Sequence, residues 1–216
     1  MTSTKKTAIR LVFYLGGLLI MTLGVAVSVK SGLGVTPISS IPYTMTIVFG
    51  LELGLATTIF SVIAALLEIP ILGKKYKLTN LLQIPVSIVF GIFMSTCSRL
   101  VQTLPAPDGF LVRFILMLIS TVIVAIGVFA YVSSGFIPLP TEGLLLAIAQ
   151  VTKTKFSSLK LIGDISMVVV SLTTCLIAIQ EFGSIGIGTI ASAVLVGNEV
   201  KILTKYFGEN LKKLFA

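Results

Sequence analysis

Long apolar segments joined by short basic stretches make up most of this sequence. A helix needs roughly 20 residues, with a lower limit near 17, to cross a hydrocarbon core of about 30 Å. Six segments reach that length, whereas 37–50 and 140–151 fall short. We therefore expect an all-α polytopic membrane protein. The segments run approximately over 11–29, 37–50, 53–73, 81–98, 114–133, 140–151, 161–180 and 182–200.

The composition agrees with a membrane protein. Hydrophobic residues make up 56% of the 216 positions and charged residues only 11%, whereas globular domains are about half apolar and a quarter charged. The first apolar run, Leu11 to Val29, follows basic residues as in a signal peptide. It exceeds the roughly 7 to 15 residues of a signal-peptide core, so we expect a retained spanning helix.

The net charge of +8 does not indicate nucleic-acid binding, because the basic residues form short clusters between apolar runs. A cytoplasmic N-terminus would leave only Lys30, Arg99 and Arg113 outside. We expect a multi-pass protein of the cell inner (plasma) membrane with cytoplasmic N- and C-termini. The residues then inside are Lys5, Lys6, Arg10, Lys74, Lys75, Lys77, Lys153, Lys155, Lys160, Lys201, Lys205, Lys212 and Lys213.

The chain contains no histidine, which removes the commonest general base and metal ligand. Cys97 and Cys175 lie in apolar segments, far from any zinc-type spacing, and are expected to be buried small residues. No paired-carboxylate motif or activated nucleophile is found. We therefore expect no catalytic residue, no metal, no cofactor and no enzymatic activity.

An internal repeat relates the two halves at one constant spacing. That spacing pairs Gly24 with Gly127 and also aligns valines, serines, glycines and prolines. A register kept through glycine, serine and proline is more specific than shared hydrophobicity. We expect a single membrane domain over 1–216, with repeat one at about 11–98 and repeat two at about 114–200. The other pairs are Val25 with Val128, Val29 with Val132, Ser31 with Ser134, Gly32 with Gly135 and Pro37 with Pro140.

The short segments decide how the halves are related. If both are re-entrant half-helices, each half has three spans, and the odd number places the second half upside down, as two inverted structural repeats. The alternative is eight full spans in two parallel halves, which the basic residues barely discriminate. Segment 139–151 makes only roughly 20 Å of helix. The length favours six transmembrane helices plus two re-entrant half-helices.

The breaks before the short segments read SGLGVTPISSIP from 31 and SGFIPLPTEG from 134. Non-helical backbone at membrane depth survives only beside protein or water, and a helix N-terminus attracts anions. Glycine permits the turns, and proline suits a first helical turn. Ordinary surface turns and serine capping are the alternatives. The candidate ligand-binding residues are Ser31, Gly32, Gly34, Thr36, Pro37, Ser39, Ser134, Gly135, Pro140, Thr141 and Glu142.

Glu142 and Asp164 are the candidates for binding a coupling proton or cation, since an ionisable group at membrane depth tends to be kept for use. Glu142 has the alternative of a carboxylate favoured at a helix start. Asp164 has the alternative of a salt bridge to Lys160, one turn away. Glu68 lies near the Lys74 cluster, and we expect it to reach water by snorkelling.

Further polar residues in the spans either line the same cavity or form hydrogen bonds between helices. The GSIGIGT stretch at 183–189 lacks the GK[ST] of a phosphate loop. Close helix packing explains it better. The polar residues are Asn80, Gln83, Ser87, Thr189 and Ser192.

Three stretches carry a family resemblance: YLGGLLIMTLGVAVSVKSGLGVTP, LLQIPVSIVFG from 81 and GIGTIASAVLVG from 186. They resemble the YczE/YyaS/YitT-like family of small bacterial integral membrane proteins, over nearly the whole chain. In that family an acidic residue commonly stands two positions after the proline of each half. Those positions are Ser39 and Glu142 here, so the first half departs from the pattern. The resemblance implies a bacterial inner-membrane protein.

The leading functional hypothesis is a secondary transporter of a small polar or anionic solute, with alternating access around a midplane site formed by two half-helix N-termini. The alternatives are a substrate-binding membrane subunit of a multi-component transporter and a non-transporting regulatory protein. The expected partners are a small-molecule or ion substrate, the lipid bilayer, and a homodimer partner or transport subunit, with no nucleic acid.

Overall fold

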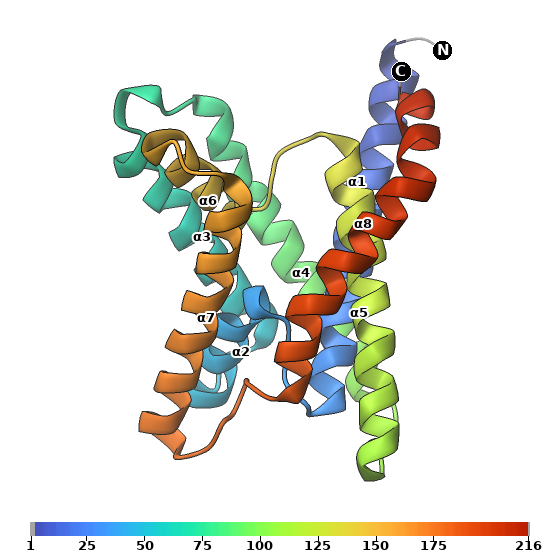
Figure 1. Cartoon of the computed structure of the whole chain (residues 1–216), viewed down its shortest axis with the longest axis vertical. Helices are drawn as coiled ribbons and strands as arrows, with labels where there is room; N and C mark the ends of the chain where they lie inside the picture. The colour runs from blue at the N-terminus through green and yellow to red at the C-terminus, as the bar shows by residue number, and fades with distance from the viewer. Residues whose placement is uncertain (1–2, 216) are drawn as a thin grey trace.

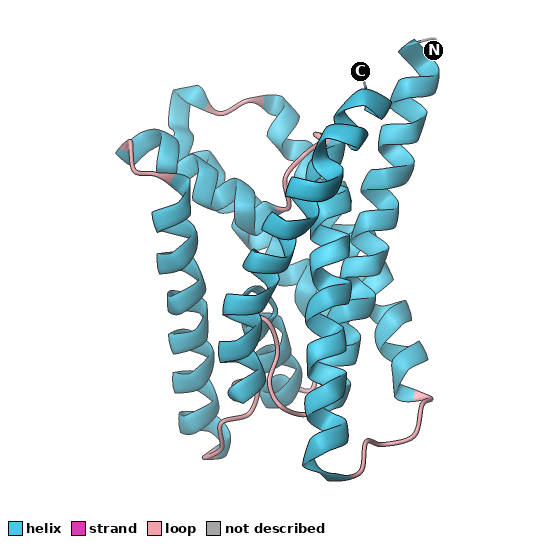
Figure 2. Ribbon diagram, turned by 45° about the vertical axis from the view of Figure 1, so that its right-hand side comes forward, coloured by secondary structure: helices cyan, strands magenta, loops and turns pink. Residues whose placement is uncertain are grey.

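The computed structural model describes residues 3–215, and these residues form helices and short connections without a strand (Figure 1, Figure 2). The all-α prediction is confirmed. Two short 3-10 helices, η1 and η2, connect α3 to α4. The elements are α1 (Ser3–Ser31), α2 (Pro37–Phe49), α3 (Leu53–Leu72), η1 (Gly73–Lys75), η2 (Leu78–Leu82), α4 (Gln83–Gln102), α5 (Gly109–Ser134), α6 (Pro140–Thr152), α7 (Phe156–Ile179) and α8 (Ile187–Phe215).

Within residues 3–215, six helices are long and apolar enough to cross a membrane, and exposed leucine, isoleucine and valine side chains cover their outer faces. This makes the chain a multi-pass membrane protein. The other two helices, α2 and α6, have 13 residues each, which is about 20 Å of helix. The last apolar segment was expected from 182, but α8 begins at Ile187 because Gly183 and its neighbours form a turn.

α1 and α5 pack as an antiparallel pair along the right-hand side of Figure 1. Gly24 lies against Val124, and a Cβ added to Gly24 would be 2.7 Å from the Val124 backbone nitrogen. At the other end of the crossing, a Cβ added to Gly127 would be 2.7 Å from Cα of Met21. The two backbones therefore touch, as small residues allow in membrane helix pairs.

Each short helix packs on a long helix of the other half of the chain. α6 lies against α3, and α2 lies against α7. The halves are joined in addition along α1 and α5. α2 and α6 run from the middle of the molecule toward opposite ends, α2 toward the lower end of Figure 1 and α6 toward the upper end.

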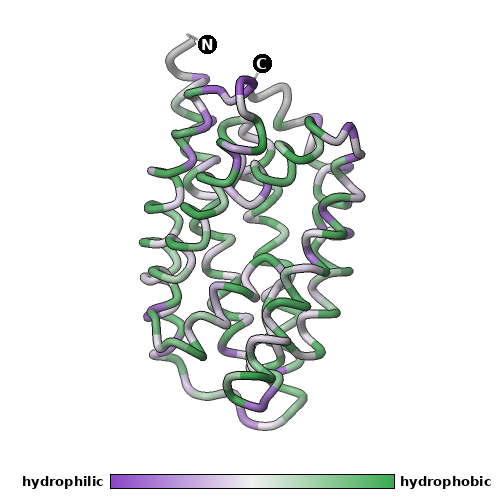
Figure 3. Tube along the Cα trace, turned by 90° about the vertical axis from the view of Figure 1, so that its left-hand side faces the viewer, coloured by the Kyte–Doolittle hydropathy of each residue, from purple (hydrophilic) through white to green (hydrophobic). Residues whose placement is uncertain are grey.

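Charge and hydropathy divide the molecule along its long axis. The start of α1, the end of α8 and the connections that carry Lys74 and Lys153 all lie at the upper end of Figure 1. Hydrophobic residues dominate the helices between the two ends (Figure 3). Most of the basic clusters therefore share one end.

Candidate functional site

The two breaks in the chain form matching turns. α1 ends at Ser31 and α5 at Ser134, and the glycines that follow, Gly32 and Gly135, have φ angles of 65° and 66°. The Ser31 hydroxyl donates to the Ser28 carbonyl at 2.6 Å, and the Ser134 hydroxyl donates to the Tyr131 carbonyl at 2.5 Å. Both serines therefore serve the ends of their own helices, outside the cavity described below.

Two arginines also occupy equivalent places in the two halves, each at the C-terminal end of a helix of the other half. Arg10 donates from Nε to the Ser134 carbonyl at 2.8 Å, at the C-terminal end of α5. Arg113 lies beside Gly32, at the C-terminal end of α1. The spacing that pairs Gly24 with Gly127 also pairs these arginines. Each positive charge thus complements the C-terminal dipole of the other half's first helix.

Pro37 and Pro140 begin α2 and α6, as the sequence predicts. The first turns use part of their own hydrogen-bonding capacity. Ser39 donates its amide to the Thr36 carbonyl at 2.9 Å, and its hydroxyl oxygen accepts from the Thr36 hydroxyl at 3.0 Å. Gly143 donates its amide to the Leu139 carbonyl at 2.8 Å. These two amides are therefore not free to bind a solute.

A small cavity separates the first turns of α2 and α6. It has a volume of about 20 Å³, enough for one water-sized group. Ser39 contributes from α2 and Thr141 from α6, so the structure brings together one candidate hydroxyl from each half. The remaining lining residues are Met21, Ile38, Pro42, Thr57, Phe60, Ser61, Phe90, Met94 and Leu139.

Two larger recesses lie toward opposite ends of the molecule. One has a volume of about 300 Å³ at the end of α1, and Lys30, Arg113 and Ser31 line it. The other has a volume of about 270 Å³ between the end of α3 and α6, and Glu68 and Gln83 line it. The recess at the end of α1 is therefore basic, whereas the recess between α3 and α6 contains a carboxylate.

Glu142 lies in the first turn of α6 but is not part of the cavity lining. Its carboxylate accepts a hydrogen bond from the Tyr131 hydroxyl. Glu142 is thus tied to α5 by its contact with Tyr131.

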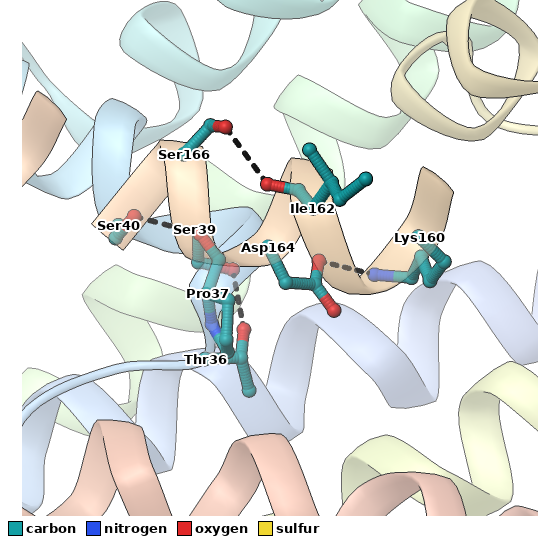
Figure 4. A network of polar contacts seen from close by, with 8 residues as sticks. All are labelled: Thr36, Pro37, Ser39, Ser40, Lys160, Ile162, Asp164 and Ser166. Carbon is teal, nitrogen blue, oxygen red and sulfur yellow. Dashed lines mark hydrogen bonds and ion pairs between the residues drawn. The ribbon is translucent and has the colours of Figure 1, made fainter. Parts of the chain in front are cut away.

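Asp164 forms an ion pair with Lys160, with 2.5 Å between Oδ1 and Nζ. The pair lies beside the start of α2 (Figure 4). This is the salt bridge that the spacing of four residues allows. Both side chains are partly exposed.

The prediction that Glu68 reaches water is wrong. Its side chain is only 1% exposed, and its Oε2 accepts from the Asn80 amide at 3.0 Å. The cause is the 3-10 connection after α3, which folds Asn80 back over Glu68 and places Gln83 beside it. One signal was available. Glu68 has no basic residue three or four positions away on its helix, so nothing in α3 could neutralise it.

The 183–189 stretch packs against the first break. Gly188 donates its amide to the Leu33 carbonyl at 2.7 Å, and Val35 donates to the Ser184 carbonyl at 3.2 Å. A Cβ added to Gly34, which has a φ of 105°, would be 2.6 Å from the Gly186 backbone nitrogen. Close packing is therefore confirmed for this stretch. Cys97 and Cys175 are buried free thiols, as predicted.

Comparison with known proteins supports the membrane assignment. Over 194 residues the chain is 25% identical to YczE of Bacillus subtilis (strain 168), described as an uncharacterized membrane protein, covering 89% of this chain and 84% of YczE. It is 26% identical over 185 residues to the uncharacterized protein YyaS of the same organism, covering 86% of this chain and 87% of YyaS. No solved structure matches the chain.

Residues 8–205 match a family described as a family of unknown function, DUF6198. The match includes both breaks, both short helices and nearly all of the six long helices. Together with the two relatives, it confirms the expected resemblance to YczE and YyaS. The chain therefore belongs to the DUF6198 family of YczE/YyaS-like membrane proteins.

Proposed function

We propose that the protein is a secondary transporter of a small polar or anionic solute, which binds between the first turns of α2 and α6. The observation that carries this proposal is the cavity in which Ser39 and Thr141 meet, one residue from each half of the chain. In transporters built from inverted repeats, the solute binds at the interface of the repeats, near the middle of the membrane.

In this proposal α2 and α6 are re-entrant half-helices, and the halves are inverted repeats in the plasma membrane. The antiparallel packing of α1 and α5 supports the inversion. The gathering of basic clusters at one end supports cytoplasmic termini, because cytoplasmic loops carry an excess of lysine and arginine.

Alternating access would open the closed cavity to one recess at a time. The repeat register supports a second state in which α7 takes the place of α3 beside the solute. It aligns Thr57 and Ser61 of α3 with Lys160 and Asp164 of α7. The α3 residues line the cavity, whereas the α7 residues form an ion pair beside α2. Rocking one half against the other would bring the α7 pair toward the solute.

The solute class follows from the charges near its path. Lys30 and Arg113 line the recess at the end of α1, and a basic cleft raises the local concentration of anions. The cavity itself offers hydroxyls and apolar side chains but no fixed charge. A small solute with one anionic group and a polar body fits this combination.

Thermal unfolding of the purified protein tests the site. The chain has no tryptophan but two buried thiols, so a dye that fluoresces on reaction with a thiol reports unfolding. A panel of small anions and neutral polar metabolites is screened. A ligand at about 100 times its Kd stabilises by roughly 2.7 kcal/mol. Ser39→Val and Thr141→Val should each lose this response.

Ser166→Val is the matched control, because Ser166 is exposed on α7 and bonds only its own helix. It should keep the response. A ligand that stabilises both cavity variants as well as the wild type would contradict the proposed site. Uptake of the ligand into proteoliposomes then tests transport. Binding without uptake would favour the substrate-binding subunit instead.

A further inference from the structure

Glu68 of α3 and Gln83 of α4 form a buried polar pair beside the recess at the end of α3. Their side chains are only 1% and 2% exposed. Oε2 of Glu68 accepts one hydrogen bond, from Asn80. Oε1 of Glu68 and Oε1 of Gln83 have no hydrogen-bond partner among the described residues. Both oxygens are therefore buried, and the side-chain nitrogen of Gln83 lies beside them.

Among the side chains that the structure describes, no basic one forms an ion pair with Glu68. The ion pairs Arg99 with Glu52 and Lys160 with Asp164 do not include it. Lys74 and its neighbouring lysines are exposed. A buried carboxylate without a counter-charge costs several kcal/mol. A bound cation or a proton is therefore required to offset this charge.

Both unpaired oxygens face the first turn of α6 at Gly143. A Cβ added to Gly143 would be 2.8 Å from Oε1 of Gln83 and would be closer still to Oε1 of Glu68. Nε2 of Gln83 would lie at 2.6 Å from the same Cβ, so the glycine is what lets the Glu68 carboxylate and the Gln83 amide lie against the first turn of α6. Thr79 and Gln150 also line the recess, which opens to water. Further oxygen ligands are thus available at its open side.

We propose that Glu68 and Gln83 bind a small monovalent cation of the sodium type at this recess. Oxygen atoms of carboxylates, amides and water are the ligands that hard cations prefer. A single carboxylate neutralises a single positive charge, and a divalent ion would leave one charge uncompensated in a buried site. A buried carboxylate oxygen next to a buried amide oxygen is an arrangement that a cation satisfies.

The cation would connect the site to the solute cavity. Gly143 and the cavity residue Thr141 share the first turn of α6. A cation on Glu68 and Gln83 therefore fastens that turn to α3 and α4. A role of this cation in coupling rests on the proposed transport function, whereas the binding of the cation does not depend on that function.

Thermal unfolding of the purified full chain tests the binding. Lithium, sodium, potassium and ammonium chloride are each titrated against choline chloride, at constant ionic strength and pH. One of these cations should raise Tm saturably, by about 5 °C at 100 times its Kd, relative to choline. Glu68→Gln should abolish the rise. Glu52→Gln, the same change at an exposed carboxylate, should keep it.

Gln83→Leu is the second variant, because it replaces the whole side-chain amide, including its oxygen ligand, with an apolar group and should raise the Kd at least 10-fold. A wild-type Tm equal in choline and in all four cations would overturn the proposal. So would an unchanged response in both Glu68→Gln and Gln83→Leu. A saturable cation response without solute uptake in proteoliposomes would leave the site standing and contradict only the transport function.

Discussion

Two junctions of this molecule occupy equivalent places in the repeat but differ in chemistry. At the junction of α7 and α2, the Ser171 hydroxyl donates to the Ser40 hydroxyl at 3.0 Å. The repeat register places Glu68 and Gly143 at the same positions in the junction of α3 and α6. There a carboxylate occupies the space beside a glycine.

The two junctions differ in charge and in how far their hydrogen bonds are satisfied. The serine pair is neutral, and its hydroxyls satisfy each other and the Pro37 carbonyl. The Glu68 junction carries a charge and an acceptor that the described residues leave unpaired. Burial of such a group lowers stability unless a ligand offsets it. Of the two aligned junctions, only the one at Glu68 contains an ionisable side chain at these positions.

The packing of α1 against α5 should be equally sensitive to a substitution in either half of the chain. Gly24→Ala and Gly127→Ala each place a Cβ against backbone of the other helix. We expect each to lower the free energy of unfolding by about 3 kcal/mol, because backbone cannot move aside. The thiol-dye unfolding assay measures both variants. Gly16→Ala on the same α1 is the control, since a Cβ there meets nothing within 4 Å.

The Glu68 junction should show a steric conflict that the serine junction lacks. Gly143→Ser copies Ser40 into α6, and we expect a loss of about 2 kcal/mol because the new side chain meets Glu68 and Gln83. Adding Glu68→Ser should recover most of that loss, which a double-mutant cycle detects. Additive effects of the two changes would mean that these residues do not compete for the same space.

The serine junction should respond to smaller changes. Ser40→Ala and Ser171→Ala each remove one partner of a buried hydrogen bond, at an expected cost of about 1 kcal/mol. The double variant should cost less than the sum of both. Cation and solute titrations should stay at their wild-type Kd values. A weakened cation response would show that this junction also takes part in binding.

The ion pair on α7 should contribute least. Asp164→Asn is expected to change the free energy of unfolding by about 0.5 kcal/mol, because the pair with Lys160 is partly exposed. Added salt should shrink this difference further. A loss above about 2 kcal/mol would show that Asp164 has a partner besides Lys160.

The sequence predicted the parts of this fold that depend on local chemistry. Pro37 and Pro140 mark the starts of α2 and α6, since proline suits a first turn. The paired glycines and serines predicted matching turns, which the structure contains. Segment length alone separated the short helices from the six long ones.

The parts that escaped prediction depend on contacts between distant residues. Glu68 is buried because the chain doubles back over it at Asn80, and no periodicity along α3 reveals this. The candidate hydroxyls meet in the cavity only at Ser39 and Thr141, because Ser31 and Ser134 bond their own helices. The local sequence pattern predicted the two breaks before α2 and α6. Which residues line the cavity between these helices depends on the direction of each side chain in the folded chain.

The exchange of short helices between the halves also bears on the order of assembly. α2 is synthesised early, but its packing partner α7 follows only after α3, α4, α5 and α6. Until α7 enters the membrane, Ser40 and Thr44 lack the neighbours that they have in the folded chain, Ser171 and Cys175. The packing of α2 is therefore completed only when the last part of the chain is in place, and a chain truncated before α7 leaves Thr44 without its contacts to Cys175 and Ser184.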